Sequence, residues 1–276
     1  IAFLLCMFML LVFALSGCGT TIDDYVPEFN SRYYINNYEV NIVIGEDNRY
    51  EINEKITATF FNNVNGIIRT LPIEQTIGVP NENGKRSIKN YEFEISNFHM
   101  NNDDGAYVEE GYSGDYSMRA YYLHLPYSMG GVPAEGEEFD SYTFDFSYTY
   151  DLGLDRDTSK DFVYFNIIGS SVDTHIGNVD FSITFPKEVT EEYRNKLIFY
   201  AGRYGVNTDG TEVEYTYDEE TYTLSGSYSA HSEYIYDFYS YGEYKAPVAL
   251  YYGEALTVYQ PLNEGYFDVS RSYTFD

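Results

Sequence analysis

The sequence contains no tryptophan, and cations, cysteines and long apolar runs are scarce in it. Of its 276 residues, 16 are Lys or Arg and 44 are Asp or Glu, which gives a net charge of −28. Binding to nucleic-acid phosphates requires a surface rich in Lys and Arg, so nucleic acid is excluded as a partner. An anionic lipid surface would also repel so acidic a chain. With 44% hydrophobic and 19% aromatic residues, however, the chain can bury enough surface to fold.

The two cysteines lie near the start of the chain, where its longest apolar run is found. Residues 1–15 are all apolar and carry no charge, but they fall short of the roughly 18–20 residues that span a bilayer. The small residues Ser16 and Gly17 follow, as in a secretory h-region and its cleavage site. A cationic segment and an initial Met are missing in front of this run, so we expect the sequence to start inside a longer chain.

Leu15-Ser16-Gly17-Cys18 resembles the bacterial lipobox. The resemblance implies a signal peptide over 1–17, acyl chains such as palmitate on Cys18, and a lipid-anchored linker over 18–24. The alternative is an ordinary signal peptide with a chance cysteine near its cleavage site. In the lipoprotein interpretation Cys6 is removed with the signal, and one cysteine remains. An internal disulfide is then excluded, and stability must come from core burial.

After Thr21 the dominant hydrophobic period is two, which is the period of half-buried β-strands. The abundant Tyr and Phe (33 and 19 residues) suit sheets, where aromatic side chains pack across strands. The sequence therefore predicts an all-β fold, an antiparallel β-sandwich architecture with at most one or two short helices. The expected strands are 38–44, 50–60, 91–95, 121–125, 142–150, 162–168, 179–185, 197–200, 213–217, 222–228 and 256–259.

One helix is predicted over 186–196, where acidic residues come early and basic residues late, as the helix dipole favours. We expect two packed sandwiches, 25–172 and 173–267, with the boundary in the stretch 169–177. A single continuous unit is the alternative. Residues 268–276 form a tail, which we expect to lead into a transmembrane segment if the chain continues.

Glu54 breaks the alternation, because it falls between Ile52 and Ile56 on the apolar face of its strand. An unpaired buried carboxylate is very costly, so Glu54 needs a partner or a wet pocket. The nearest cation in an apolar setting is Arg69. We therefore predict a structural ion pair between Glu54 and Arg69; a β-bulge that turns Glu54 toward water is the alternative.

A series of short motifs in fixed order resembles the bacterial predicted membrane proteins grouped as domain of unknown function family 2207, over about residues 22–267. Where the family has Trp, this chain has Phe165. The resemblance implies an extracytoplasmic β-rich ectodomain, which in most members continues into transmembrane helices, and it implies no activity. The motifs are Ile22–Tyr25, the strand that ends at Ile44, Ile52–Ile56, Gly66–Pro72, Tyr142–Tyr150, Tyr164–Gly169, Ile176–Asn178, Phe185–Pro186, Leu256–Tyr259 and Gly265–Phe267.

Patterns that carry chemistry are few. A zinc site needs three or four converging ligands, and the four histidines lie in separate segments. Residues 155–161 place oxygen ligands at alternating positions, as a calcium loop does, but lack its Gly and its final Glu, so a solvated acidic loop is expected. No catalytic residue, metal ligand or cofactor is predicted. The histidines are His99, His124, His175 and His231.

The stretch 228–252 is rich in Tyr and can stack on sugar rings or bind a partner. The alternative is composition bias, since Tyr is dense throughout the chain. The tyrosines concerned are Tyr234, Tyr236, Tyr239, Tyr241 and Tyr244.

Together these features predict a non-catalytic protein on the extracytoplasmic face of the bacterial cell membrane. It is expected to be held there by lipid on Cys18 or by a C-terminal transmembrane segment, and to bind or scaffold an envelope protein or a glycan. The alternatives are an envelope enzyme such as a carbohydrate hydrolase and the sensor ectodomain of an integral membrane protein. A deep pocket with converging polar groups and an acid in a perturbed environment would favour the enzyme.

Overall fold

The structure is a computed structural model, and the described residues all belong to one compact unit. Cys18 lies outside them, as does most of the acidic loop 155–161. The described ranges are 32–80, 86–111, 117–131, 133, 137–153, 160–203, 208–209, 212–238 and 242–268.

Nearly all regular structure in these ranges is β-strand, as the period-two pattern predicts. The strands are β1 (Tyr33–Ile44), β2 (Arg49–Phe60), β3 (Val64–Pro72), β4 (Glu74–Pro80), β5 (Arg86–Glu92), β6 (Glu94–Met100), β7 (Tyr107–Gly111), β8 (Met118–Met129), β9 (Ser141–Asp151), β10 (Phe162–Ile168), β11 (Val179–Thr184), β12 (Ile198–Arg203), β13 (Thr208–Asp209), β14 (Glu214–Asp218), β15 (Thr223–Tyr228), β16 (Ser232–Phe238), β17 (Gly242–Val248) and β18 (Glu254–Pro261).

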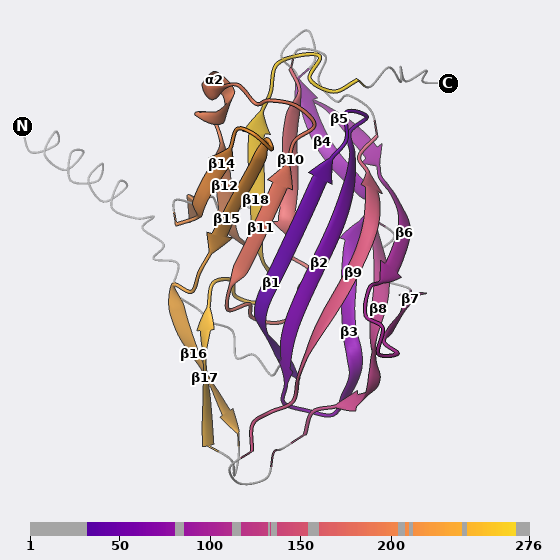
Figure 1. Ribbon diagram of the computed structural model, residues 1–276, viewed down its shortest axis with the longest axis vertical. Coiled ribbons are helices and arrows are strands. Elements are labelled where there is room, and N and C mark those ends of the chain that lie inside the picture. Colours follow the sequence, from indigo (N-terminus) through magenta and orange to yellow (C-terminus); the bar gives the residue numbers. More distant parts are fainter. Residues whose placement is uncertain are drawn as a thin grey trace, which may run out of the picture. The chain divides into compact units, whose positions relative to one another are not determined.

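The largest sheet has seven strands in the order β14-β15-β11-β1-β2-β9-β6 (Figure 1). Within it β1 pairs in parallel with β11, and its other strand pairs are antiparallel. The β1–β11 pair joins strands from the two segments predicted as separate sandwiches. Because one sheet takes strands from both segments, the described residues form one unit, and the expected division near residue 172 is not present in the fold.

Two smaller sheets pack on one face of the seven-stranded sheet: β3-β8-β7 and β10-β18-β12-β13. Phe98 of β6 stacks on Tyr121 of β8, with ring centroids 3.8 Å apart. Phe181 of β11 contacts Phe199 of β12 at 5.4 Å. Side chains of all three sheets form a single buried hydrophobic core. The result is a sandwich with one broad sheet on one side and two narrow sheets on the other.

The strand register explains which side chains enter this core. In β1 and β2, the buried residues Ile42 and Ile52 lie opposite each other, as do Ile44 and Tyr50. The residues between them point to the other face, which is polar. There Asn53 of β2 donates to Ser147 of β9 at 3.1 Å. This alternation is what a sheet with one buried face requires.

The β16–β17 hairpin packs on a second, smaller core that consists mainly of aromatic rings. Tyr236 is 5% exposed and its ring contacts Tyr34 and Phe61 at 5.9 Å and 4.9 Å. Tyr244 contacts the same two rings. Of the tyrosines predicted to be exposed for sugar or partner binding, these two are therefore packed against the body of the protein.

The predicted helix over 186–196 is much shorter in the structure. Helix α2 spans Glu191–Arg194, and the described ranges contain no other α-helix. Before it, Thr190 has an extended backbone, and Val189 is buried with its N–H donating to the Tyr217 hydroxyl at 3.2 Å. Burial of Val189 holds the first half of the segment in an extended form, so the charge pattern alone overestimates the helix. Within the described part of the chain no helix has the length and apolarity needed to cross a bilayer.

Candidate functional site

Glu54 lies at the centre of the sandwich. It belongs to the inward-facing row of β2, opposite Val40 of β1 and Phe146 of β9, and it is 1% exposed. Arg69 belongs to the inward-facing row of β3 in the facing sheet and is 5% exposed. The alternation that places Ile52 and Ile56 in the core thus places a carboxylate between them.

The structure brings Glu54 and Arg69 together in a bidentate ion pair. The Nε and Nη2 atoms of Arg69 donate to the two carboxylate oxygens of Glu54 at 2.9 Å and 2.8 Å. The hydroxyl of Tyr148 donates to Oε1 at 2.5 Å, and that of Tyr38 donates to Oε2. Each carboxylate oxygen therefore accepts two hydrogen bonds, which is the condition for burying a charge without a large penalty.

The same contacts determine the protonation of the cluster. Burial alone would lower the pKa of Arg69, but the Glu54 carboxylate and the two tyrosines outweigh it and hold that pKa well above its ordinary value. Burial, together with the charge of Glu54, raises the pKa of Tyr38 and of Tyr148 well above the ordinary value. Both hydroxyls therefore stay protonated as donors. The cluster is a polar clamp between two sheets, and Glu54 has no free lone pair with which to act as a base.

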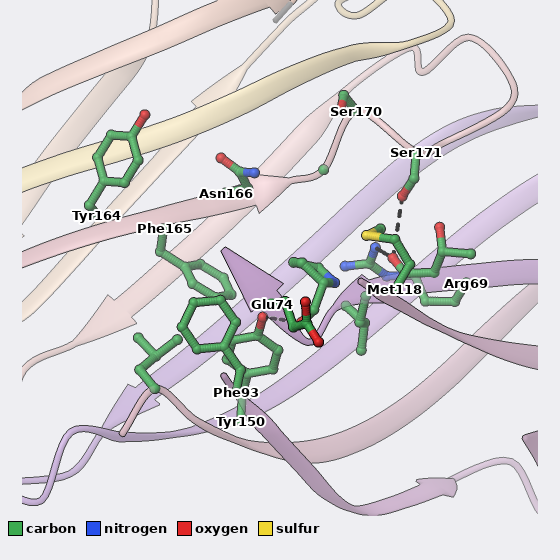
Figure 2. Close-up of a pocket in the computed structure, with 15 residues that line it drawn as sticks. Arg69, Glu74, Phe93, Met118, Tyr150, Tyr164, Phe165, Asn166, Ser170 and Ser171 are labelled. Carbon is green, nitrogen blue, oxygen red and sulfur yellow. Dashed lines mark hydrogen bonds between the residues drawn. The ribbon is translucent and has the colours of Figure 1, made fainter. Parts of the chain in front are cut away.

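A cavity of about 250 Å³ lies beside this clamp, where β3 and β10 approach each other over the large sheet. Figure 2 shows the rings of Phe93, Tyr150 and Phe165 together on one side of it, and Arg69 with Met118 on the other. The complete lining is Arg69, Thr70, Leu71, Pro72, Glu74, Phe93, Met118, Tyr150, Leu152, Tyr164, Phe165, Asn166, Gly169, Ser170 and Ser171.

The backbone carbonyls of two lining residues of β3, Thr70 and Pro72, accept hydrogen bonds from side chains. The carbonyl of Thr70 accepts from Nη1 of Arg69 at 2.9 Å and from the hydroxyl of Ser171 at 3.3 Å. The carbonyl of Pro72 accepts from the hydroxyl of Tyr150 at 2.5 Å. The side chains thereby cover this edge of β3, so a further strand would have to displace them in order to pair with it.

Glu74 lines the cavity at the start of β4 and is exposed. It lies directly opposite Glu92 of β5 in the antiparallel pair, and Glu92 is exposed as well. Among the ion pairs between residues whose side chains are described, neither carboxylate takes part. The cavity thus combines an aromatic wall, a neutralised guanidinium and an acidic rim.

The other residues singled out by the sequence do not converge on this cavity. The histidines lie apart, and in the described ranges no group of three or more His, Cys, Asp or Glu side chains is placed to hold a metal ion. His175 is fully buried; its Nδ1 accepts from the N–H of Tyr252 at 2.9 Å, and burial lowers its pKa to about 4. Cys18, Tyr239 and Tyr241 lie outside the described residues.

The sequence predicted the Glu54–Arg69 ion pair, but neither its two tyrosine donors nor the cavity. The residues of its aromatic wall come from three separate segments. Tyr150 lies in β9, Phe165 lies in β10, and Phe93 lies between β5 and β6. The one signal available was the Gly66–Pro72 motif, which contributes Arg69, Thr70, Leu71 and Pro72 to the lining.

Residues 34–234 match the model of the N-terminal domain of a predicted membrane protein family, DUF2207. The match covers well over half of the 276 residues. The chain belongs to the DUF2207 family. The resemblance noted in the sequence is thereby confirmed, and no curated protein shows significant similarity to this DUF2207 chain.

The DUF2207 chain is also weakly similar to parts of several solved structures. These are native yeast LTA4 hydrolase (TM-score 0.40, 8% identity, 83% of this chain and 29% of that chain), a protease-like protein from Parabacteroides distasonis (0.37, 8%, 83% and 40%) and the M1 zinc metallopeptidase from Deinococcus radiodurans (0.32, 9%, 83% and 42%). The chain spans less than half the length of each. Similarity at this level carries no argument about activity.

Proposed function

We propose that this DUF2207 chain is a non-catalytic binding domain, tethered to the bacterial cell membrane on its extracytoplasmic face, and that the cavity between β3 and β10 is where it binds. Small-molecule sites are concave, largely apolar and supplied with a few placed polar groups. The cavity has these properties, with the rings of Phe93, Tyr150 and Phe165 on one wall and Glu74 at its rim.

The observation that carries a binding role rather than catalysis is the state of the charged groups beside the cavity. General acid–base catalysis needs a group that can exchange a proton with its ligand. Glu54 is a buried carboxylate paired with the lining residue Arg69, and its oxygens accept four hydrogen bonds. Arg69 is held by the same contacts and by the Thr70 carbonyl. Glu54 and Arg69 are therefore unavailable for proton transfer. Among the described lining residues Glu74 is the remaining carboxylate, and the lining holds no histidine or second acid to work with it.

Tethering and the extracytoplasmic face are supported by the sequence together with the family. DUF2207 members are predicted membrane proteins. The lipobox-like Leu15–Cys18 follows an apolar run that has the form of a secretory signal. Acyl chains on Cys18 would anchor the domain stably, because two or more chains hold a protein on a membrane where a single chain gives only reversible binding.

The experiment is expression of the full chain in a bacterium with an alkyne-tagged palmitate in the medium, followed by protease treatment of intact cells or spheroplasts. We expect the wild type to carry the label, to sediment with membranes and to be cleaved from outside. Cys18→Ala should abolish the label. Cys6→Ala makes the same chemical change within the predicted signal peptide and should leave the label intact.

An unlabelled wild type that resists protease in intact cells and spheroplasts would overturn the proposed tethering and location. Equal labelling of the wild type and the Cys18→Ala variant would overturn the role of Cys18 as the acylated residue.

A further inference from the structure

Three aromatic side chains, Phe93, Tyr150 and Phe165, line one wall of the cavity. The rings of Phe93 and Tyr150 have centroids 5.6 Å apart, and those of Tyr150 and Phe165 are 5.8 Å apart at a nearly perpendicular angle of 75°. Rings in such an arrangement attract cations through their quadrupoles, and clusters of them recognise quaternary ammonium groups. Figure 2 shows the Glu74 carboxylate beside these rings.

The charges around the cavity favour the same kind of ligand. Glu54 and Arg69 cancel each other, which leaves the negative charge of Glu74 at the lining. Glu92 adds a second negative charge, because the two glutamates lie directly opposite on paired strands. Like charges in that position, about 5 Å apart at Cβ, repel each other. A cation bound between them and the rings would relieve this repulsion.

The hydrogen bonding of the cavity wall favours a quaternary ammonium group over a primary one. A primary ammonium group carries three N–H donors that need acceptors when they leave water. The carbonyl of Thr70 already accepts two hydrogen bonds from protein side chains, and that of Pro72 accepts one. A quaternary ammonium group has no N–H donor, so it can enter an apolar wall without losing hydrogen bonds. The volume of about 250 Å³ corresponds to roughly eight water molecules, which is enough for a small trimethylammonium compound.

We propose that the cavity binds the quaternary ammonium group of a small molecule of the choline class, with the methyl groups against Phe93, Tyr150 and Phe165 and the charge facing Glu74. This inference rests on the proposed binding function and names its ligand. Because the ammonium charge is balanced by carboxylates at the rim, binding weakens as salt concentration rises.

The test is calorimetric titration of the full purified chain with choline chloride, compared with 3,3-dimethyl-1-butanol, in which a neutral carbon replaces the nitrogen. We expect choline to bind with a dissociation constant of about 1 mM or lower, in the range open to a ligand of so few atoms. The neutral analogue should bind at least about tenfold more weakly. It has the shape of choline but no charge, so it lacks the attraction to the aromatic rings and to the carboxylates.

Two variants test where choline binds. In each, binding of choline is compared with binding of the neutral analogue, because unfolding would weaken both equally. Glu74→Gln should weaken choline binding by about three- to tenfold and leave the weak binding of the neutral analogue unchanged. Phe165→Leu keeps an apolar side chain and should weaken choline binding more than that of the analogue. Glu214→Gln removes an exposed acid of β14, at the far edge of the large sheet, and is the matched control.

Equal affinities of the wild type for choline and for the neutral analogue would overturn the proposal, as would absence of choline binding at tens of millimolar. Equal effects of Glu74→Gln and Glu214→Gln would also overturn it. If choline fails while glucose binds and Phe165→Leu weakens that binding, the proposed binding function stands and the choice of ligand is wrong. The location experiment with Cys18→Ala has a separate readout and is unaffected by either result.

Discussion

Glu54 and His175 are both buried titratable side chains, and the protein buries them in opposite ways. Glu54 forms a bidentate ion pair with Arg69 and accepts four hydrogen bonds in all, in the centre of the sandwich. His175 lies near the β16–β17 hairpin among the rings of Tyr234 and Tyr251, at 4.7 Å and 5.3 Å. Burial lowers its pKa to about 4, so at neutral pH it carries no charge.

The difference shows which hydrogen-bond donors the surroundings of each buried side chain provide. Around Glu54, the strands β1 and β9 of the large sheet and β3 of the facing sheet contribute donors, so the carboxylate is compensated in place. Around His175, the described contacts include aromatic rings and the backbone N–H of Tyr252, and burial lowers the pKa of the imidazole. The stability of the Glu54 cluster therefore depends on keeping every hydrogen-bond partner. The contribution of His175 to stability depends on pH.

The largest expected effect comes from removing one partner of the clamp. Arg69→Met leaves the Glu54 carboxylate buried without its cation, and we expect the free energy of unfolding to fall by about 3–5 kcal/mol. Urea denaturation measures this. Lys55→Met is the matched control, because Lys55 is half exposed in a surface ion pair with Asp145 at 3.3 Å and should cost about 1 kcal/mol or less. Similar losses in the two variants would contradict a special role for the clamp.

Removing one tyrosine donor should have a smaller effect. Tyr148→Phe deletes a hydrogen bond to a charged oxygen of Glu54, for which we expect a loss of about 1.5–3 kcal/mol. Tyr215→Phe makes the same change at an exposed tyrosine and should leave urea denaturation unchanged. A neutral effect of Tyr148→Phe would show that Glu54 does not need that donor.

Acidification should lower the folding stability of the protein through His175. Its pKa is about 4 in the folded protein and its ordinary value is 6.5, so the unfolded chain takes up the proton first as the pH falls. Stability is therefore complete above about pH 6.5 and is lost as the pH falls toward 4. Between pH 7.5 and 5 this loss is about 2 kcal/mol.

Urea denaturation at the two pH values measures the loss in the wild type and in His175→Asn, whose side chain does not titrate. The variant should lack this part of the pH dependence. His231→Asn, at an exposed histidine of the same region, should behave like the wild type. An identical pH dependence of stability in the wild type and His175→Asn would show that His175 does not contribute to it.

The smallest effect is expected when all members of the clamp are replaced together. A chain with Glu54→Leu, Arg69→Met, Tyr38→Phe and Tyr148→Phe has neither a buried charge nor an unpaired hydroxyl in that place. Its unfolding free energy should lie within about 1 kcal/mol of the wild type, far above that of Arg69→Met alone. A quadruple variant less stable than Arg69→Met would mean that the clamp contributes through its packing.

Much of the fold could be predicted from local patterns, because alternation of side chains is a property of each strand. The inward position of Glu54 and its need for Arg69 follow from the same alternation and from the cost of a buried charge. The parallel pairing of β1 with β11 could not be predicted, since nothing in either strand encodes its neighbour. The helix over 186–196 was predicted too long because Val189 is held by tertiary burial, which overrides the charge pattern.

The cavity could not be predicted for a similar reason. Phe93, Tyr150 and Phe165 are separated by long stretches of sequence, and each resembles a core residue. Glu74 and Glu92 become opposed only when β4 and β5 pair. Their meeting at one place depends on how three sheets pack, which single-strand patterns do not determine.

The measurement that tests the central claim most directly is hydrogen exchange of the full chain with and without choline, followed by mass spectrometry. If the cavity is the binding site, choline slows exchange in peptides that cover residues 69–74 and 165–171 and leaves those of β16 and β17 unchanged. Unchanged exchange in both cavity segments at a saturating choline concentration would contradict the account.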